Sequence, residues 1–241
     1  GIFMKIIYLR QLQNFLEKYT GIKVLGVIPY FQNMEIPEED SLALKPQKKS
    51  LGLKKKIKID VIYLPHISNF TDFDALEQED DVSLRYIRKD DRLCNADVII
   101  IPGTKNTIED LGYLKKSGLA EKIISIFHSR AAVTMIGICG GYQMLGKMIY
   151  DRKGIESKRM EIKGLGVLPI ATEFHSEKIL SQVKGRHLFS DIEVSGYEIH
   201  HGKTKITGNS RPLFEILQSG NKKAKRYDGT ITRDTRCWGT Y

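Results

Sequence analysis

The order of apolar and polar residues from position 57 onward predicts a parallel β-sheet. Short, almost continuous runs of Val and Ile occur at residues 57–65 (IKIDVIYLP), 96–104 (ADVIIIPGT) and 132–139 (AVTMIGIC). Such runs are typical of strands that are buried on both faces. Helical patterns follow the second and third runs, at residues 107–129 with a break near Gly118, and from 140 to about 150. The alternation indicates an α/β fold, with a mostly parallel sheet and helices on both faces.

The pattern changes beyond residue 160, where the apolar runs become shorter and no long helical pattern separates them. We expect strands in the segments LGVLPIA, SGYEIHHGKT, PLFEILQ and RCWGTY. The α/β domain is therefore expected over residues 57–241, with an added β-rich segment in its second half.

Residues 1–44 read as part of a different domain. Apolar residues at helical spacing end at Gly21, and a short apolar strand, VLGVIPY, follows from Val24 to Tyr30. A helix and then a buried strand form half of a βαβ crossover, which needs a sheet to pack on. No such sheet is visible nearby in the sequence. We expect residues 1–44 to be the tail of a domain whose body lies upstream of residue 1.

A lysine-rich stretch separates the two parts. Residues 45–58 read KPQKKSLGLKKKIK and supply seven lysines to a net charge of +9. A basic excess can indicate nucleic-acid binding, but this one is local and has no aromatic-and-basic RNA-binding motif beside it. We interpret residues 45–56 as a solvated linker and expect no nucleic-acid partner. No run of eighteen apolar residues occurs, so no membrane span is expected either.

Cysteine usage singles out one thiol. The chain has three cysteines, Cys94, Cys139 and Cys237, and their number and wide spacing suggest neither a disulfide framework nor a metal site. Cys94 and Cys237 are interpreted as buried thiols of a protein in the reducing cytoplasm. Cys139 differs because it stands between a buried strand and a helix, in the stretch MIGICGGYQMLG.

Strand, then Gly-Ile-Cys-Gly-Gly, then helix is the pattern of a nucleophile elbow. A cysteine beside glycine is most often structural, but the full pattern favours Cys139 as a nucleophile. A thiol at a helix N-terminus lies near free N–H groups and the positive end of the helix dipole, so we expect a stabilised thiolate. The N–H of Gly140 would face the oxyanion of an acyl intermediate. Gly103, just past another buried strand, is the expected second donor, although Pro102-Gly103-Thr104 can equally be an ordinary turn.

The stretch Gly137–Gly146 resembles the nucleophile motif of class I glutamine amidotransferases, and in particular the cobyric acid synthase branch. The segments TGIKVLGVIPY with EEDSLAL, LPHISNFTDFDAL, IIIPGTKNTIEDLGYLKKSGL and GYEIHHGKT are similar to further segments of that branch. Together they cover most of residues 20–204. The resemblance implies a class I glutamine amidotransferase-like fold for residues 57–241.

The resemblance also implies a reaction. Cys139 attacks the side-chain amide of glutamine, a thioester forms, ammonia leaves, and water releases glutamate. Gly103 and Gly140 act as oxyanion donors, and Gln143 contacts the bound glutamine. In the family, ammonia passes to an ATP-activated carboxylate of a corrin ring during cobalamin biosynthesis. We therefore expect glutamine and a corrin as partners, no cofactor or metal in residues 1–241, and ATP with Mg in the upstream domain.

Two features depart from the family pattern. No G-x-x-x-x-G-K-[ST] phosphate-binding motif occurs, so residues 1–241 are not expected to activate a carboxylate. The catalytic histidine of the family follows a Gly-Thr-Tyr-Leu-His-Gly motif, and the sequence ends at Trp238-Gly239-Thr240-Tyr241. That histidine is expected beyond Tyr241, in a domain truncated at its C-terminus. Within the chain, His200 and His201 remain as candidates for the general base or for a substrate contact.

Two alternatives stay open at the level of sequence. One is a sister amidotransferase, such as cobyrinic acid a,c-diamide synthase or the glutaminase that amidates lipid II, although EEDSLAL and PHISNF speak against both. The other is a non-catalytic remnant that keeps the fold but lacks a general base.

Overall fold

The structure is a computed structural model that describes residues 2–26, 57–93 and 95–241, in two units, Gly1–Leu44 and Lys45–Tyr241. The first unit contains α1 (Ile2–Thr20), which ends just before Gly21 at φ +70°, as the sequence pattern predicts. Most of the strand expected at 24–30 lies outside the described residues, and so does the linker at 45–56. The assignment of residues 1–44 to an upstream domain therefore stays a prediction.

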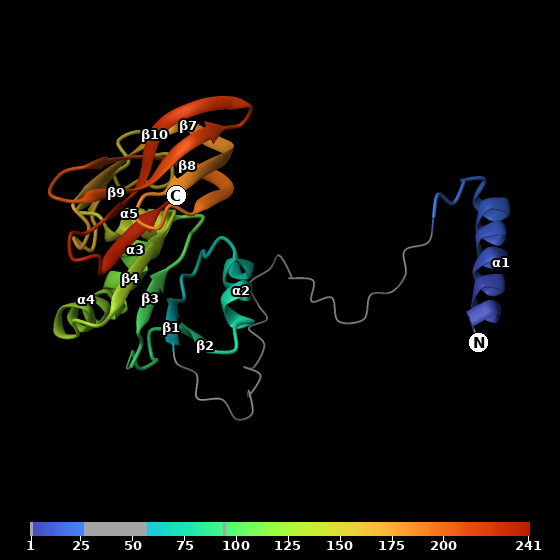
Figure 1. Cartoon of the computed structure of the whole chain (residues 1–241), viewed down its shortest axis with the longest axis horizontal. Helices are drawn as coiled ribbons and strands as arrows, with labels where there is room; N and C mark the ends of the chain where they lie inside the picture. The colour runs from blue at the N-terminus through green and yellow to red at the C-terminus, as the bar shows by residue number, and fades with distance from the viewer. Residues whose placement is uncertain (1, 27–56, 94) are drawn as a thin grey trace. The chain divides into compact units, whose positions relative to one another are not determined.

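The second unit is built on parallel strands in the order β2-β1-β3-β4-β11 (Figure 1). Each neighbouring pair in this run is parallel. Their bounds are β1 (Ile57–Ile62), β2 (Val82–Ile87), β3 (Val98–Ile101), β4 (Thr134–Ile138) and β11 (Cys237–Thr240). The three Val/Ile runs of the sequence thus form β1, β3 and β4, while β2 was not expected.

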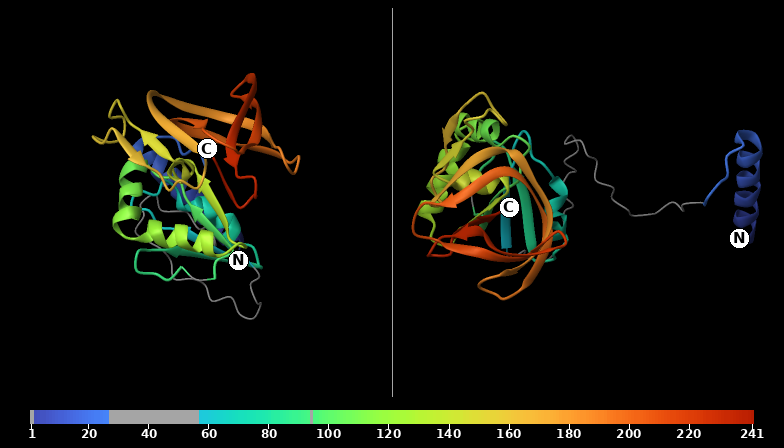
Figure 2. Two further views of the ribbon diagram at one scale, coloured as in Figure 1. Left: turned by 90° about the vertical axis from the view of Figure 1, so that its left-hand side faces the viewer. Right: turned by 90° about the horizontal axis from the view of Figure 1, so that it is seen from above.

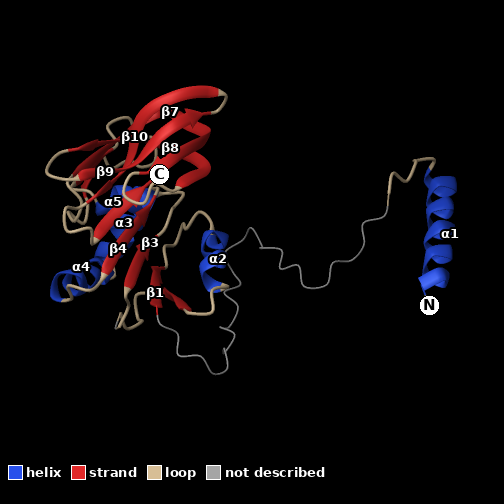
Figure 3. Cartoon of the chain, viewed as in Figure 1, coloured by secondary structure: helices blue, strands red, loops and turns tan. Residues whose placement is uncertain are grey.

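Helices cover both faces of these strands, which confirms the predicted fold class (Figure 3). One face carries α3 (Thr107–Lys116), α4 (Leu119–Ser129) and α5 (Gly140–Leu145) over the larger apolar core. The other carries the short η1 (Phe70–Phe73) and α2 (Asp74–Glu77) over a smaller one. Gly118, at φ +75°, separates α3 from α4 at the predicted break.

The helix after the cysteine is shorter than the sequence pattern suggested. It was expected to run to about residue 150, but α5 ends at Leu145 and the strand β5 (Met148–Tyr150) follows. Gly146 and Gly164 explain the early end, because a Cβ at Gly164 would lie only 1.9 Å from the carbonyl oxygen of Gly146. The backbones of Gly146 and Gly164 touch at this turn. A helix that continued past Leu145 would prevent this contact.

The added β-rich segment continues the same sheet with mostly antiparallel strands. Beyond β11 the order is β10-β9-β7-β5-β6, and β8 pairs with β7. Of these pairs, β5 with β7 is parallel and the others are antiparallel. Their bounds are β6 (Glu161–Lys163), β7 (Ile170–His187), β8 (Glu193–Ile206), β9 (Arg211–Ser219) and β10 (Lys222–Ile231). The strand expected over LGVLPIA is wrong for most of its length, because β7 begins only at Ile170 and runs on to His187. β8 extends the expected SGYEIHHGKT by two residues at each end. β10 was not expected.

The antiparallel strands curve over the end of the sheet at which the parallel strands finish (Figure 2). This arrangement brings β8 against the carboxyl end of β4, so the two parts of the unit meet around Cys139. In open α/β sheets, sites form at the carboxyl ends of strands. No helix among the described residues is long and apolar enough to cross a membrane.

Candidate active site

Cys139 is held in a strained backbone conformation at the end of β4. Its φ is +49° and its ψ is −107°, a combination that residues with a side chain rarely adopt. Two hydrogen bonds fix it: its N–H donates to the carbonyl oxygen of Thr240 at 2.8 Å, and its own carbonyl oxygen accepts from the N–H of Gln143 at 3.1 Å. A strained cysteine on a strand-to-helix turn has the geometry of a nucleophile elbow.

The glycines around Cys139 are required by close approach of neighbouring backbone. A Cβ at Gly141 would lie 1.9 Å from the carbonyl oxygen of Ile101, at the end of β3. A Cβ at Gly140 would lie 2.5 Å from the Thr104 methyl group. The Gly-Gly pair thus lets α5 start directly against the turn that follows β3.

That turn brings Gly103 to the cysteine. The position of a Cβ on Gly103 is 3.7 Å from Cys139 Cβ. The N–H of Ser68 donates to the Gly103 carbonyl oxygen at 3.0 Å, which ties the turn to the loop after β1. The structure therefore places Gly103 and Gly140 next to Cys139, as the sequence suggested. Their roles as oxyanion donors stay a prediction.

The Cys139 side chain is a neutral thiol in this environment. It donates to the carbonyl oxygen of Ile199 on β8, with 3.6 Å between sulfur and oxygen. Burial raises its pKa to about 11, and the carboxylates of Glu156, Asp228 and Asp72 act in the same direction. The N–H of Gly140 lowers this pKa but does not outweigh burial.

The expectation that the elbow itself stabilises a thiolate is therefore not met. A helix of six residues, Gly140–Leu145, has only a small dipole. The side chain of Cys139 stays partly exposed, and β8 packs against one side of its sulfur. A proton acceptor beside the thiol would be needed to form a thiolate.

Gln143 lies one helical turn beyond Cys139, as predicted, but its amide is fully engaged. The side chain is 3% exposed. Its Oε1 accepts from the Thr107 hydroxyl at 3.2 Å, and its Nε2 donates to the Tyr241 hydroxyl oxygen at 3.2 Å. Tyr241 in turn lies 2.5 Å from the hydroxyl of Thr204 on β8. Contact of Gln143 with a bound glutamine stays a prediction.

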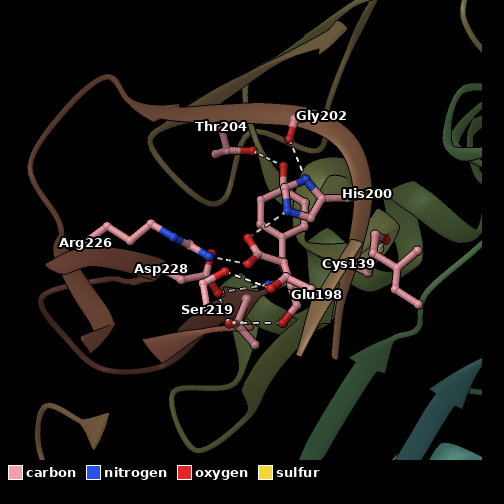
Figure 4. Close-up of polar contacts among 12 residues, drawn as sticks. Cys139, Glu198, His200, Gly202, Thr204, Ser219, Arg226 and Asp228 are labelled. Atoms are coloured by element: carbon pink, nitrogen blue, oxygen red, sulfur yellow. Dashed lines mark hydrogen bonds and ion pairs between the residues drawn. The ribbon is translucent and has the colours of Figure 1, made fainter. Parts of the chain in front are cut away.

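His200 and Glu198 are buried side by side and meet the partly exposed Arg226 in a polar cluster (Figure 4). Its Nδ1 lies 2.6 Å from the Gly202 carbonyl oxygen and its Nε2 lies 2.9 Å from Glu198 Oε1. Arg226 donates to the other oxygen of Glu198. Burial opposes ionisation of Glu198, but the hydrogen bonds from His200 and Arg226 outweigh it, and the pKa of Glu198 lies below its usual range.

This geometry argues against His200 as the general base. Each ring nitrogen already faces an acceptor, and the ring stacks on Tyr241 with 3.6 Å between centroids. The sulfur contacts the main chain of Ile199 instead. His201 has its Nδ1 3.2 Å from the His175 carbonyl oxygen. Whether either histidine contacts substrate stays a prediction.

Several residues of the site were not found from the sequence. Asp228 of β10 accepts hydrogen bonds from the N–H and the hydroxyl at the end of β11, those of Tyr241 and Thr240. Burial raises the pKa of Asp228. Glu156 reaches α3 from the loop after β5. Neither carboxylate lies in a motif, so no sequence signal marks it. Glu198 stands inside GYEIHHGKT, where a charge between apolar residues of a strand is a usable signal.

Comparison with known proteins places these residues in a family. Residues 58–241 match the family model described as the CobB/CobQ-like glutamine amidotransferase domain. The chain belongs to this family. The match covers every residue of the site and confirms the resemblance read from Gly137–Gly146.

Curated relatives in the family are cobyric acid synthases. The chain is 40% identical over 238 residues to the cobyric acid synthase of Syntrophobacter fumaroxidans, which covers 95% of this chain and 46% of the relative. It is 47% identical over 216 residues to that of Desulfitobacterium hafniense, covering 84% of this chain and 41% of the relative. The chain spans about half the length of the curated relatives it matches.

Solved structures share the amidotransferase fold. One, titled as the structure of PurLQS from Thermotoga maritima, aligns with a TM-score of 0.57 at 18% identity and covers 77% of this chain and 86% of that chain. A second, titled as a glutamine amidotransferase, aligns with a TM-score of 0.55 at 15% identity over 76% and 87% of the two chains. At these identities the likeness concerns the fold.

Proposed function

We propose that residues 57–241 form the glutaminase of a cobyric acid synthase, with Cys139 as the nucleophile. The observation that carries the proposal is the strained elbow, in which a cysteine at φ +49° lies against Gly103 and beside Gly140. Strain of this kind persists where the surrounding structure enforces it, and it is typical of functional sites. A structural cysteine at a strand end has no need of it.

The proposed reaction begins when Cys139 loses its proton and its sulfur adds to the side-chain amide carbon of glutamine. The oxyanion accepts hydrogen bonds from backbone N–H groups at Gly103 and Gly140. The tetrahedral intermediate collapses to a thioester, and the nitrogen leaves as ammonia after taking a proton. Water then adds to the thioester carbon, the C–S bond breaks, and glutamate leaves while the sulfur regains a proton.

The proton acceptor is proposed to follow Tyr241 in the sequence. β11 is parallel to β4, and the Thr240 carbonyl oxygen bonds to the Cys139 N–H, so a chain that continues from Tyr241 leaves the sheet beside the sulfur. This place fits the histidine that the family resemblance expects two residues farther on. A general base there would overcome the high pKa of the thiol, a contribution typically worth about 10² to 10⁴ in rate.

The ammonia is proposed to serve ATP-dependent amidation of corrin carboxylates by the domain expected upstream. ATP and Mg would act in that domain, not in the glutaminase. The similarity to cobyric acid synthases over nearly the whole chain supports this assignment.

Labelling by a diazoketone analogue of glutamine tests the nucleophile. We expect peptide mass spectrometry to find the adduct on Cys139, and we expect glutamine to protect against it while asparagine does not. Cys237 is an internal control, because it is fully buried. Cys139→Ser should abolish the adduct. Labelling that ignores glutamine, or that occurs first on Cys94 or Cys237, would contradict the proposal.

A further inference from the structure

The loop between β5 and β6 is wound around a buried carboxylate. Asp151, 1% exposed, accepts hydrogen bonds from the N–H groups of Ile155 at 2.6 Å, Glu156 at 2.9 Å and Ser157 at 2.9 Å. Gly154, at φ +62°, makes the turn possible. A loop with three N–H groups on one carboxylate has a fixed backbone, so the direction in which Glu156 leaves it is fixed too.

Glu156 reaches from this loop to the start of α3. Its Oε2 accepts from the N–H of Thr107 at 2.8 Å. Asn106 already caps the same helix through the Glu109 N–H. Glu156 is therefore a second side-chain partner of this helix start, brought from another part of the chain, and its charge raises the pKa of the Cys139 thiol.

Thr107 connects Glu156 with the amide of Gln143. Its N–H donates to Glu156 Oε2 at 2.8 Å, and its hydroxyl donates to Gln143 Oε1 at 3.2 Å. The hydroxyl oxygen also lies 3.2 Å from the place of a Cβ on Gly140. The carboxylate that holds the main chain of Thr107 therefore also determines where its hydroxyl meets Gln143.

This contact has a consequence for Gln143. The Thr107 hydroxyl donates to Gln143 Oε1, and the NH₂ group of the amide faces Tyr241. If Thr107 shifted, the amide would lose the donor that keeps its oxygen on this side and could turn over. The two orientations offer opposite hydrogen-bonding groups to anything that Gln143 contacts.

We infer that Glu156 is a positioning residue that, through the Thr107 hydroxyl, sets the orientation of the Gln143 amide for glutamine. The inference rests on the proposed function, in which Gln143 contacts the substrate. A purely structural Glu156 would cap α3 and leave substrate recognition unchanged. Burial raises the pKa of Glu156 to about 7, so both of its charge states are accessible near neutral pH.

A ratio of labelling rates separates positioning from capping. The second-order rate constants for Cys139 are measured with the diazoketone analogue of glutamine, which requires recognition, and with iodoacetamide, which does not. Glu156→Gln should lower the first by about three- to tenfold, the effect of one misplaced hydrogen bond, and leave the second unchanged. The control Glu109→Gln removes an exposed carboxylate from the same first turn of α3 and should change neither.

Variants of Thr107 test the connection and guard against poor folding of Glu156→Gln. Thr107→Val should lower the analogue rate and Thr107→Ser, which keeps the hydroxyl, should not. Glu156→Gln added to Thr107→Val should have no further effect, because the connection is already broken. An unchanged ratio in Glu156→Gln, equal ratios in the Ser and Val variants, or full additivity would overturn the inference. Absence of glutamine protection in the unmodified chain would overturn both this inference and the proposed function.

Discussion

At the scale of single residues, Cys139 combines a strained backbone with an unreactive resting state. The strain costs on the order of 1–3 kcal/mol. The hydrogen bonds to Thr240 and from Gln143 offset it. The thiol stays protonated because burial and three nearby carboxylates outweigh the single N–H of Gly140. In the proposed reaction, this thiol therefore needs a proton acceptor beside it before it can attack glutamine.

The pH dependence of alkylation tests this resting state. With a pKa of about 11, Cys139 should react with iodoacetamide at a rate that rises about tenfold per pH unit from pH 7 to 9.5, because the thiolate fraction rises by that factor. The rate is measured on the Cys139 peptide by mass spectrometry. A plateau near pH 8 would show instead that the site stabilises the thiolate.

The site was readable from the sequence only where it is local. Cys139 and Gly140 are adjacent, and Gly103 ends a strand that the apolar pattern made visible. The raised thiol pKa was not readable, because it depends on β8 covering the sulfur some sixty residues later in the chain. The same holds for Glu156 and Asp228, which reach the site from a loop and a strand that carry no motif.

At the scale of elements, the site depends on how closely α5 approaches the end of β3. The approach is possible only because Gly141 has no side chain, since its Cβ would meet the Ile101 carbonyl oxygen at 1.9 Å. A backbone carbonyl cannot rotate away as a side chain can. The distance between α5 and the end of β3 therefore depends on residue 141, where glycine carries a hydrogen atom in place of the methyl group of alanine.

Gly141→Ala should destabilise the domain by about 2–3 kcal/mol, because β3 and α5 must move apart. Gly112→Ala is the matched control: this glycine lies within α3, and a Cβ there meets nothing within 4 Å. It should stabilise the protein by about 0.5–1 kcal/mol through helix propensity. Urea unfolding of both variants gives the comparison. Equal stability of the two would contradict the packing described for α5.

How well each strand could be predicted from the sequence depended on how deeply its side chains are buried. The parallel strands β1, β3 and β4 are buried on both faces, so their sequences are continuous and apolar. β2 alternates buried Val82 and Leu84 with the polar Ser83 and Arg85, and it was missed. β7 and β10 carry exposed polar residues along much of their length, because they belong to a solvated antiparallel ribbon. Their hydrogen bonds, rather than an apolar pattern, define them.

At the scale of the whole molecule, every site contact described above lies within residues 57–241. A chain that begins at Ile57 should therefore keep the melting temperature of the amidotransferase unit within about 2 °C, because it keeps both apolar cores. It should also keep the rate at which the glutamine analogue labels Cys139. Differential scanning calorimetry and labelling of the two chains side by side provide the measurement. Loss of either property would show that residues 1–56 support the site.

The position of β11 in the sheet also determines when, during synthesis of the chain, the strand-to-helix turn at Cys139 can form. β11 lies between β4 and β10, yet it follows β4 by about a hundred residues. Until the ribosome has released residues 237–240, β4 has an open edge and the Cys139 N–H lacks its partner on Thr240. Contacts so distant in sequence form late in folding. A nascent chain therefore carries Cys139 without this contact, and we expect its strained backbone conformation to arise only when β11 closes the sheet.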